Sequence, residues 1–322
     1  MTEFELIERY FRRPARNAVL GVGDDAALIA PSPGFEIAAS VDMLVEGRHF
    51  FPGTDAEALG HKTLAVNLSD LAAMGATPRW ALLAFALPSV DEGWLAAFAR
   101  GFFALADAHG VDLVGGDTTR GPRNLCVTVL GEVPAGRALR RSGARGGDSI
   151  WVSGKLGDAA LAIAHQSGRI RLEGADLVDC ENALARPAPR VALGLGLRGI
   201  ASAVIDVSDG LVGDLGHVLD ASQIGATIDL DLLPRSSALE RQLGGAAREI
   251  TLQCLLAGGD DYELCFAAPR ARDAAIVTLG DRLGLPLTRI GIATAQHAGL
   301  EVRDATGRPL ERLPHAFDHF AP

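Results

Sequence analysis

The chain has 322 residues, of which 48% are hydrophobic and 22% are charged, and its formal net charge is -10. These values are typical of a folded protein with two domains of ordinary size and argue against a disordered chain. The acidic balance argues against a nucleic-acid-binding protein, whose affinity depends on basic residues, and suits divalent cations instead.

The composition also predicts in which cellular compartment the protein works and that it does not bind a membrane. The four cysteines are scattered without a C-x-x-C pair, which favours reduced thiols and a cytoplasmic protein. The first five residues are acidic and lack a signal-peptide pattern. The apolar run Trp80–Leu87 is ended by Pro88 and is too short to span a bilayer.

Helix and strand patterns alternate in the first 135 residues. The stripe Phe4, Ile7 and Phe11 predicts a helix, and short strands at 18–22 and 26–30 flank Gly23-Asp24-Asp25. The further expected elements are strands at 35–43, 79–87, 111–114 and 125–133, a helix from a capping box at Thr54 to Ala76, and a helix from a capping box at Ser89 to His109. This order predicts an α+β or mixed α/β domain.

A second domain is expected after the linker candidate Pro134-Ala135-Gly136, which gives domains at 1–135 and 136–322. Its predicted elements are strands at 149–153, 203–207, 226–230 and 262–267 and a helix at 209–221. The segment 137–145 carries four arginines. They could clamp phosphates or form a solvated linker.

The stretch from Gly60 to Ala76 predicts a helix that is buried on most sides, because it is rich in alanine and leucine. Asn67 and Asp70 lie three residues apart and therefore share one face. A carboxylate on a buried helix needs a partner. Asp70 therefore either accepts hydrogen bonds from nearby backbone amides or faces a metal cluster.

Four acidic clusters follow or end apolar strands: Gly23-Asp24-Asp25, Ser40-Val41-Asp42, Gly115-Gly116-Asp117 and Asp206-Val207-Ser208-Asp209-Gly210. Gly-Asp pairs are also ordinary turn residues, which is the simpler explanation for any one of them. Four such clusters together indicate magnesium, which prefers hard oxygen ligands, and phosphate oxygens, which backbone amides beside glycine can approach.

The same motifs resemble the thiamine-monophosphate kinase family, which itself resembles the aminoimidazole ribonucleotide synthetase superfamily. The matching stretches span nearly the whole chain, in family order: GVGDDAALI (21–29), SVDMLVEGRHF (40–50), HKTLAVNLSDLAAMGATP (61–78), GGDTTRGP (115–122), GRALRRSGARGGD (136–148), AVIDVSDGLVGDLGH (203–217), GGDDYELCF (258–266) and FDHF (317–320).

The resemblance implies a two-domain α/β fold, dimerisation through the N-terminal sheet, and the last step of thiamine diphosphate biosynthesis. In that step ATP phosphorylates thiamine monophosphate directly, without a phosphoenzyme and with several magnesium ions. By position, the implied metal ligands are Asp25, Ser40, Val41, Asp42, Asp70, Asp117, Asp206 and Asp209. The implied ATP contacts are Gly116, Asp117, Arg141 and Ser208, and the implied substrate contacts are His49, Asp260 and Phe317.

Three of these positions depart from the family pattern. Val41 stands where threonine is common, so it could ligate a metal only through its backbone carbonyl. Asp260 replaces a frequent glutamate, and Phe317 replaces Tyr or Trp. The ring of Phe317 could stack on the thiamine rings or, alternatively, pin the C-terminal segment to its domain.

Two kinds of rival remain at this point. A selenophosphate synthetase would require a reactive N-terminal cysteine and a hydrogenase-maturation protein a C-terminal one, whereas Cys126 lies inside a predicted strand and the sequence ends Phe320-Ala321-Pro322. A non-catalytic divalent-ion-binding protein would need neither the arginines nor His49.

Overall fold

The chain folds as two compact units in a computed structural model that describes residues 1–295 and 299–316. The first unit comprises Met1–Leu71 and Ala76–Ala138, and the second comprises Ala72–Gly75 and Leu139–Pro322. The mixed α/β fold in two domains is therefore confirmed, while the exact boundary after residue 135 stays a prediction. Over the described residues, no helix is both long and apolar enough to cross a membrane.

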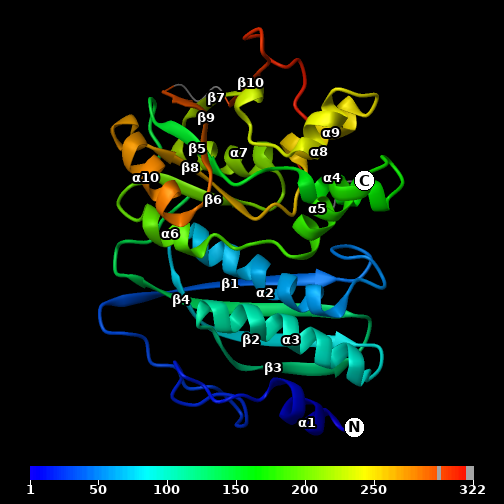
Figure 1. The fold of residues 1–322 in the computed structure, drawn as a ribbon. Helices are drawn as coiled ribbons and strands as arrows, with labels where there is room; N and C mark the ends of the chain where they lie inside the picture. The colour runs from blue at the N-terminus through cyan, green and yellow to red at the C-terminus, as the bar shows by residue number, and fades with distance from the viewer. Residues whose placement is uncertain (296–298, 317–322) are drawn as a thin grey trace. The chain divides into compact units, whose positions relative to one another are not determined.

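The first unit is built on a four-stranded mixed sheet with the strand order β1-β4-β2-β3. β4 pairs antiparallel with both β1 and β2, whereas β3 pairs parallel with β2 at one edge (Figure 1). The elements of this unit are α1 (Glu3–Leu6), the π-helix η1 (Ile7–Phe11), β1 (Phe35–Val45), α2 (Ala56–Ala73), β2 (Thr77–Leu87), α3 (Glu92–His109), β3 (Asp112–Arg120) and β4 (Asn124–Pro134).

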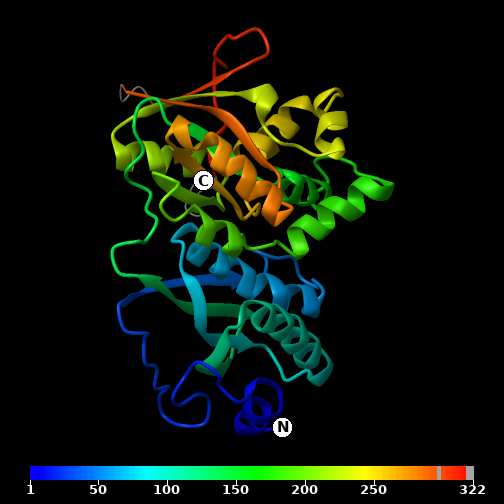
Figure 2. The ribbon, with the colours of Figure 1, turned by 60° about the vertical axis from the view of Figure 1, so that its left-hand side comes forward.

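Helices α2 and α3 pack together over one face of this sheet (Figure 2). Their backbones approach closely because glycines lie at the crossing: a Cβ atom on Gly101 would lie 1.8 Å from the carbonyl oxygen of Glu57, and one on Gly60 would lie 2.1 Å from that of Phe98. As predicted, α2 is buried over most of its surface. The crossing fixes α2, which carries Asp70, against the rest of the unit.

Gly101→Ala should destabilise the protein by about 3 kcal/mol, because the added methyl group collides with backbone that cannot rotate away. The measurement is a thermal or urea melt. Gly93→Ala, on the same helix α3, is the matched control, because a Cβ there lies 3.4 Å from its nearest neighbour. If Gly101→Ala melts like the Gly93 variant, the helix crossing is looser than the structure has it.

The second unit contains a six-stranded sheet with the order β10-β7-β9-β5-β8-β6, in which the one parallel pair among the described strands is β10 with β7. Its helices are α4 (Asp158–Gln166), α5 (Gly174–Ala185), α6 (Val191–Leu197), α7 (Leu211–Ser222), α8 (Ser237–Leu243), α9 (Arg248–Ala257) and α10 (Asp273–Leu283), with 3-10 turns η2 (Leu230–Leu232) and η3 (Arg270–Arg272). Its strands are β5 (Ser149–Ser153), β6 (Ala203–Val207), β7 (Gly225–Asp229), β8 (Glu263–Ala268), β9 (Leu287–Thr294) and β10 (Leu300–Arg303).

The adjacent strands β5, β8 and β6 are buried at every residue, although β6 lies at the edge of the sheet, and such burial is typical of a sheet covered on both faces. One face carries Ile150, Ile205 and Leu215 in a single apolar core. On the other face, the rings of Trp151 and Phe266 stack with centroids 6.5 Å apart. Because both faces are covered, the strand ends and the loops that follow them are where a ligand is expected.

Two predictions for the first unit were wrong. The segments 18–22 and 26–30 form no ladder in the structure and meet only in an isolated bridge between Leu20 and Leu28, which is 56% exposed. A pair of short strands without a buried face is not stable by itself. The strand expected to end at Val114 instead continues to Arg120, because β2 offers it a parallel partner along that whole length.

Candidate functional site

Ser40 and Asp42 both bond to helix α2, Ser40 through its side chain and Asp42 through its backbone, and as alternate residues of β1 they point to the same face of the sheet. The hydroxyl of Ser40 donates to Oδ2 of Asp70 over 2.5 Å. The backbone N–H of Asp42 donates to Oδ1 of Asn67 over 3.0 Å, and Asn67 in turn donates to the carbonyl of Thr63. The predicted ligands of β1 and α2 are therefore neighbours in this unit.

Val41 points to the opposite face of the sheet and is 57% exposed. Its side chain is thus directed away from those of Ser40 and Asp42. Asp42 lies in the interior of β1 and not at its end, because the strand runs on to Val45. The structure thus places two carboxylates and a hydroxyl on one strand-and-helix surface.

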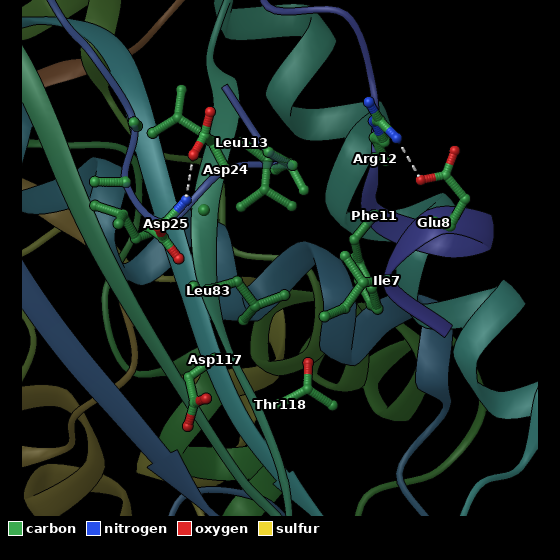
Figure 3. A pocket seen from close by; sticks show the side chains of 18 of the residues that line it. Ile7, Glu8, Phe11, Arg12, Asp24, Asp25, Leu83, Leu113, Asp117 and Thr118 are labelled. Atoms are coloured by element: carbon green, nitrogen blue, oxygen red, sulfur yellow. Dashed lines mark hydrogen bonds and ion pairs between the residues drawn. The ribbon is translucent and has the colours of Figure 1, made fainter. Parts of the chain in front are cut away.

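A cavity of about 830 Å³ lies near the edge strand β3 (Figure 3). Asp25, Gly116 and Asp117 line it, together with apolar residues that include Phe11 and Leu83. The carboxylate of the neighbouring Asp24 accepts from the backbone N–H of Asp25 over 2.9 Å. Two of the predicted acidic clusters therefore border one hollow with an apolar wall.

The backbone at position 116 requires glycine. Its φ is +149°, and a Cβ atom there would stand 1.8 Å from the carbonyl oxygen of Leu83 on β2. Gly116 and Asp117 belong to β3 and are exposed, and β3 is an edge strand. Backbone groups on the free side of an edge strand can bind a ligand, which suits the implied contacts of Gly116 and Asp117 with a nucleotide.

Of the predicted substrate residues, His49 lies in the loop after β1. Its Nδ1 accepts the backbone N–H of Val45 over 3.0 Å, so the neutral ring carries its proton on Nε2. Phe317 lies outside the described residues, so its predicted role stays a prediction.

In the second unit, β6 ends at the cluster that contains Asp206, Ser208 and Asp209. Asp206 is 5% exposed within the strand. The backbone N–H groups of Ser208 and Asp209 both donate to Oδ2 of Asp214, over 2.9 and 3.0 Å. Asp214, in the first turn of α7, is 4% exposed and thereby fixes the loop that carries the predicted ATP and metal residues.

Burial raises the pKa of Asp214 to about 7, and the charge of Asp209 raises it too, whereas hydrogen bonds from the two amides and the charge of Arg141 lower it. The guanidinium of Arg141 therefore acts on the same loop. Asp260 is tied to this loop as well, because its N–H donates to the carbonyl of Ser208 over 2.9 Å. The predicted residues of the second unit thus gather at one end of β6 and β8.

The donor set in each unit suits a hard cation, since it consists of carboxylate, hydroxyl and carbonyl oxygens. Over the ranges that the structure describes, however, no group of three or more His, Cys, Asp or Glu side chains is arranged to hold a metal ion. The site with several magnesium ions therefore stays a prediction.

Both units match known sequence families. Residues 23–133 match the N-terminal domain of AIR synthase related protein, and residues 145–303 match its C-terminal domain. The curated thiamine-monophosphate kinase of Salmonella typhimurium is 46% identical over 324 residues, which cover 99% of this chain and 98% of that protein. The chain belongs to the thiamine-monophosphate kinase family. The rival families considered from the sequence are thereby set aside.

Solved structures of this family have the same fold. The crystal structure of thiamine-monophosphate kinase from Stenotrophomonas maltophilia K279a superposes with a TM-score of 0.85 at 49% identity, covering 94% of this chain and 96% of that one. A structure described as AaThiL complexed with AMPPCP and TMP superposes with a TM-score of 0.78 at 29% identity, over 93% of this chain and 92% of that one. The family and fold expected from the sequence motifs are confirmed.

Sequence reasoning missed two residues near these clusters. Asp214 follows the DVSDG motif, and a signal was present, because a carboxylate in the first helical turn often accepts backbone amides. Tyr262 ends the GGDDY motif, and its hydroxyl donates to Oδ1 of Asp260 over 3.1 Å. Nothing in the residue pattern indicated that this tyrosine would turn back toward Asp260.

Proposed function

We propose that this chain is an ATP-dependent kinase that phosphorylates thiamine monophosphate to thiamine diphosphate by direct transfer. The observation that carries the proposal is the near-full-length identity of 46% with a thiamine-monophosphate kinase. It is supported by the family member solved with AMPPCP and TMP. AMPPCP is an ATP analogue, and we take TMP to be thiamine monophosphate, the phosphate-bearing acceptor.

The residues divide by role. The acidic and hydroxyl groups would hold magnesium, which supplies charge neutralisation and alignment of phosphate oxygens when bound. These metal-binding residues are Asp25, Ser40, Val41 through its carbonyl, Asp42, Asp70, Asp117, Asp206 and Asp209. Gly116, Asp117, Arg141 and Ser208 bind ATP, and His49, Asp260 and Phe317 bind thiamine monophosphate.

Phosphoryl transfer needs positioning and charge stabilisation more than covalent help from the protein. Each unit meets this need with rigid backbone. Ser40 and Asp42 are held on a strand, and the amides of Ser208 and Asp209 are held by Asp214. Arg141 adds a guanidinium that can bind phosphate oxygens bidentately.

The protein is proposed to act as a cytoplasmic homodimer. The open face of β1 supports the dimer, because Ile37, Val41 and Met43 on that face are 37, 57 and 49% exposed. A row of exposed apolar side chains on a sheet is a surface that a second copy can cover.

The deciding experiment mixes the purified protein with ATP, magnesium and thiamine monophosphate and follows the products by mass spectrometry. We expect thiamine diphosphate and ADP in equal amounts, and no phosphate on the protein. Release of inorganic phosphate without thiamine diphosphate would contradict the proposal. No nucleotide turnover, with divalent ions still bound, would instead favour the non-catalytic ion-binding protein.

A further inference from the structure

The loop between α9 and β8 has an unusual backbone. Among the non-glycine residues that the structure describes, three have a positive φ: Gln223, Asp260 and Tyr262. Gln223 is the left-handed residue that ends α7, a common way for a helix to finish. The other two lie two residues apart in one loop, with φ of 70° and 50°.

Such a conformation is unfavourable for an L-residue and persists only where the surroundings enforce it. Here the backbone N–H groups of Asp260 and Tyr262 donate to the carbonyls of Ser208 and Val207, over 2.9 and 2.8 Å. Between them, the carboxylate of Asp261 accepts the N–H of Gly157 over 2.9 Å. The loop is therefore tied to the end of β6 and also to the start of α4.

This backbone geometry brings together the side chains of Asp260 and Tyr262, which lie two residues apart in the chain. The hydroxyl of Tyr262 donates to Oδ1 of Asp260 over 3.1 Å, while the tyrosine as a whole is only 9% exposed. A packed ring cannot follow a moving carboxylate, so the hydroxyl restricts the orientation of Asp260. Both the strained backbone and the hydrogen bond thus serve to hold one acidic side chain.

We infer that Tyr262 is a positioning residue, which orients the Asp260 carboxylate toward the cationic, amine-bearing heterocycles of thiamine monophosphate. The inference rests on the proposed function. An oriented carboxylate binds such a ligand better than a mobile one, because the entropy of fixing the side chain is not lost on binding. ATP does not benefit, since its predicted contacts are Gly116, Asp117, Arg141 and Ser208.

A purely structural role for Tyr262 makes a different prediction. If the ring only fills space in the second unit, phenylalanine should replace it with no effect on either substrate. If the hydroxyl only stabilises the fold, its loss should lower the melting temperature and weaken both substrates together.

The test compares Tyr262→Phe with Tyr10→Phe in steady-state kinetics on the full chain. Tyr10 is the chain's other tyrosine, and its hydroxyl lies 3.5 Å from Oε2 of Glu92 on the first unit, so the control removes a similar group elsewhere. We expect Tyr262→Phe to raise KM for thiamine monophosphate about tenfold, equivalent to 1.4 kcal/mol. Its kcat and its KM for ATP should stay within about twofold of wild type, as should all constants of Tyr10→Phe.

Asp260→Asn and the double variant complete a cycle. Because Tyr262 acts through Asp260, the double variant should bind thiamine monophosphate no worse than Asp260→Asn alone. Any one of three results would overturn the inference: an unchanged KM for thiamine monophosphate in Tyr262→Phe, an equal rise in both of its Michaelis constants, or additive losses in the double variant. An inactive wild type would overturn the proposed function and the inference with it, whereas an active wild type with a normal Tyr262→Phe variant overturns the inference alone.

Discussion

Asp42→Asn should reduce the turnover of thiamine monophosphate about a thousandfold while the protein stays folded. The carboxylate is a proposed magnesium ligand, and asparagine offers a neutral oxygen in its place, which binds a hard cation much less strongly. The fold should survive because Asp42 is held by its backbone: its N–H donates to Asn67, and asparagine keeps that N–H. Steady-state assays across a magnesium series, together with a thermal melt, measure both effects.

Glu36→Gln is the matched control, because it removes a carboxylate from the same strand β1 at an exposed position. Glu36 accepts the N–H of Gly136 over 3.2 Å, a bond that glutamine can keep. The control should retain turnover within about twofold. Near-normal turnover of Asp42→Asn at saturating magnesium would rule out Asp42 as a ligand.

The alternation of β1 explains why this part of the site could be predicted from the sequence. Residues at i and i+2 of any strand share a face, so Ser40 and Asp42 had to lie together once the strand was recognised. The helix at 60–76 was equally clear from its apolar composition. The meeting of Ser40 with Asp70 depends on how strand and helix pack, and it was expected only because the family resemblance grouped them.

Helix ends show the limit of local patterns. The expected capping box at Thr54 is not the observed cap, because Oδ1 of Asp55 accepts the N–H of Ala58 over 2.8 Å. Likewise α3 is capped by Asp91, two residues after the expected Ser89. Several capping residues stand near each start, and tertiary packing selects among them.

The strand β3 shows a second limit of prediction from local sequence patterns. Gly115, Gly116 and Asp117 read as a turn, because glycine and aspartate are common in turns and weaken strands. In the structure they continue a strand because β2 pairs with them, with Ala84 opposite Asp117. Pairing between distant segments is invisible to a local pattern, so the residues of the site were found but their conformation was not.

Asp214 lies within the matching stretch 203–217, but the sequence assigned it no role. Asp214→Ala should lower turnover about a hundredfold, because the N–H groups of Ser208 and Asp209 lose their shared acceptor and the loop loses its position. Removing the buried acceptor of these two hydrogen bonds should also cost about 1–3 kcal/mol of stability. Kinetics well below the melting temperature separate the first effect from the second.

Asp214→Asn decides whether the acceptor oxygen or the charge matters. Asparagine keeps an oxygen that can accept from both amides and lacks the negative charge that burial disfavours. If Asp214 only positions the loop, the asparagine variant should regain most of the turnover that alanine loses. Asp220→Ala, on the exposed side of the same helix α7, is the control and should behave like wild type. If the asparagine variant is as inactive as the alanine variant, the charge itself takes part in binding ATP or metal. If the alanine variant keeps full turnover, the loop holds its position without Asp214.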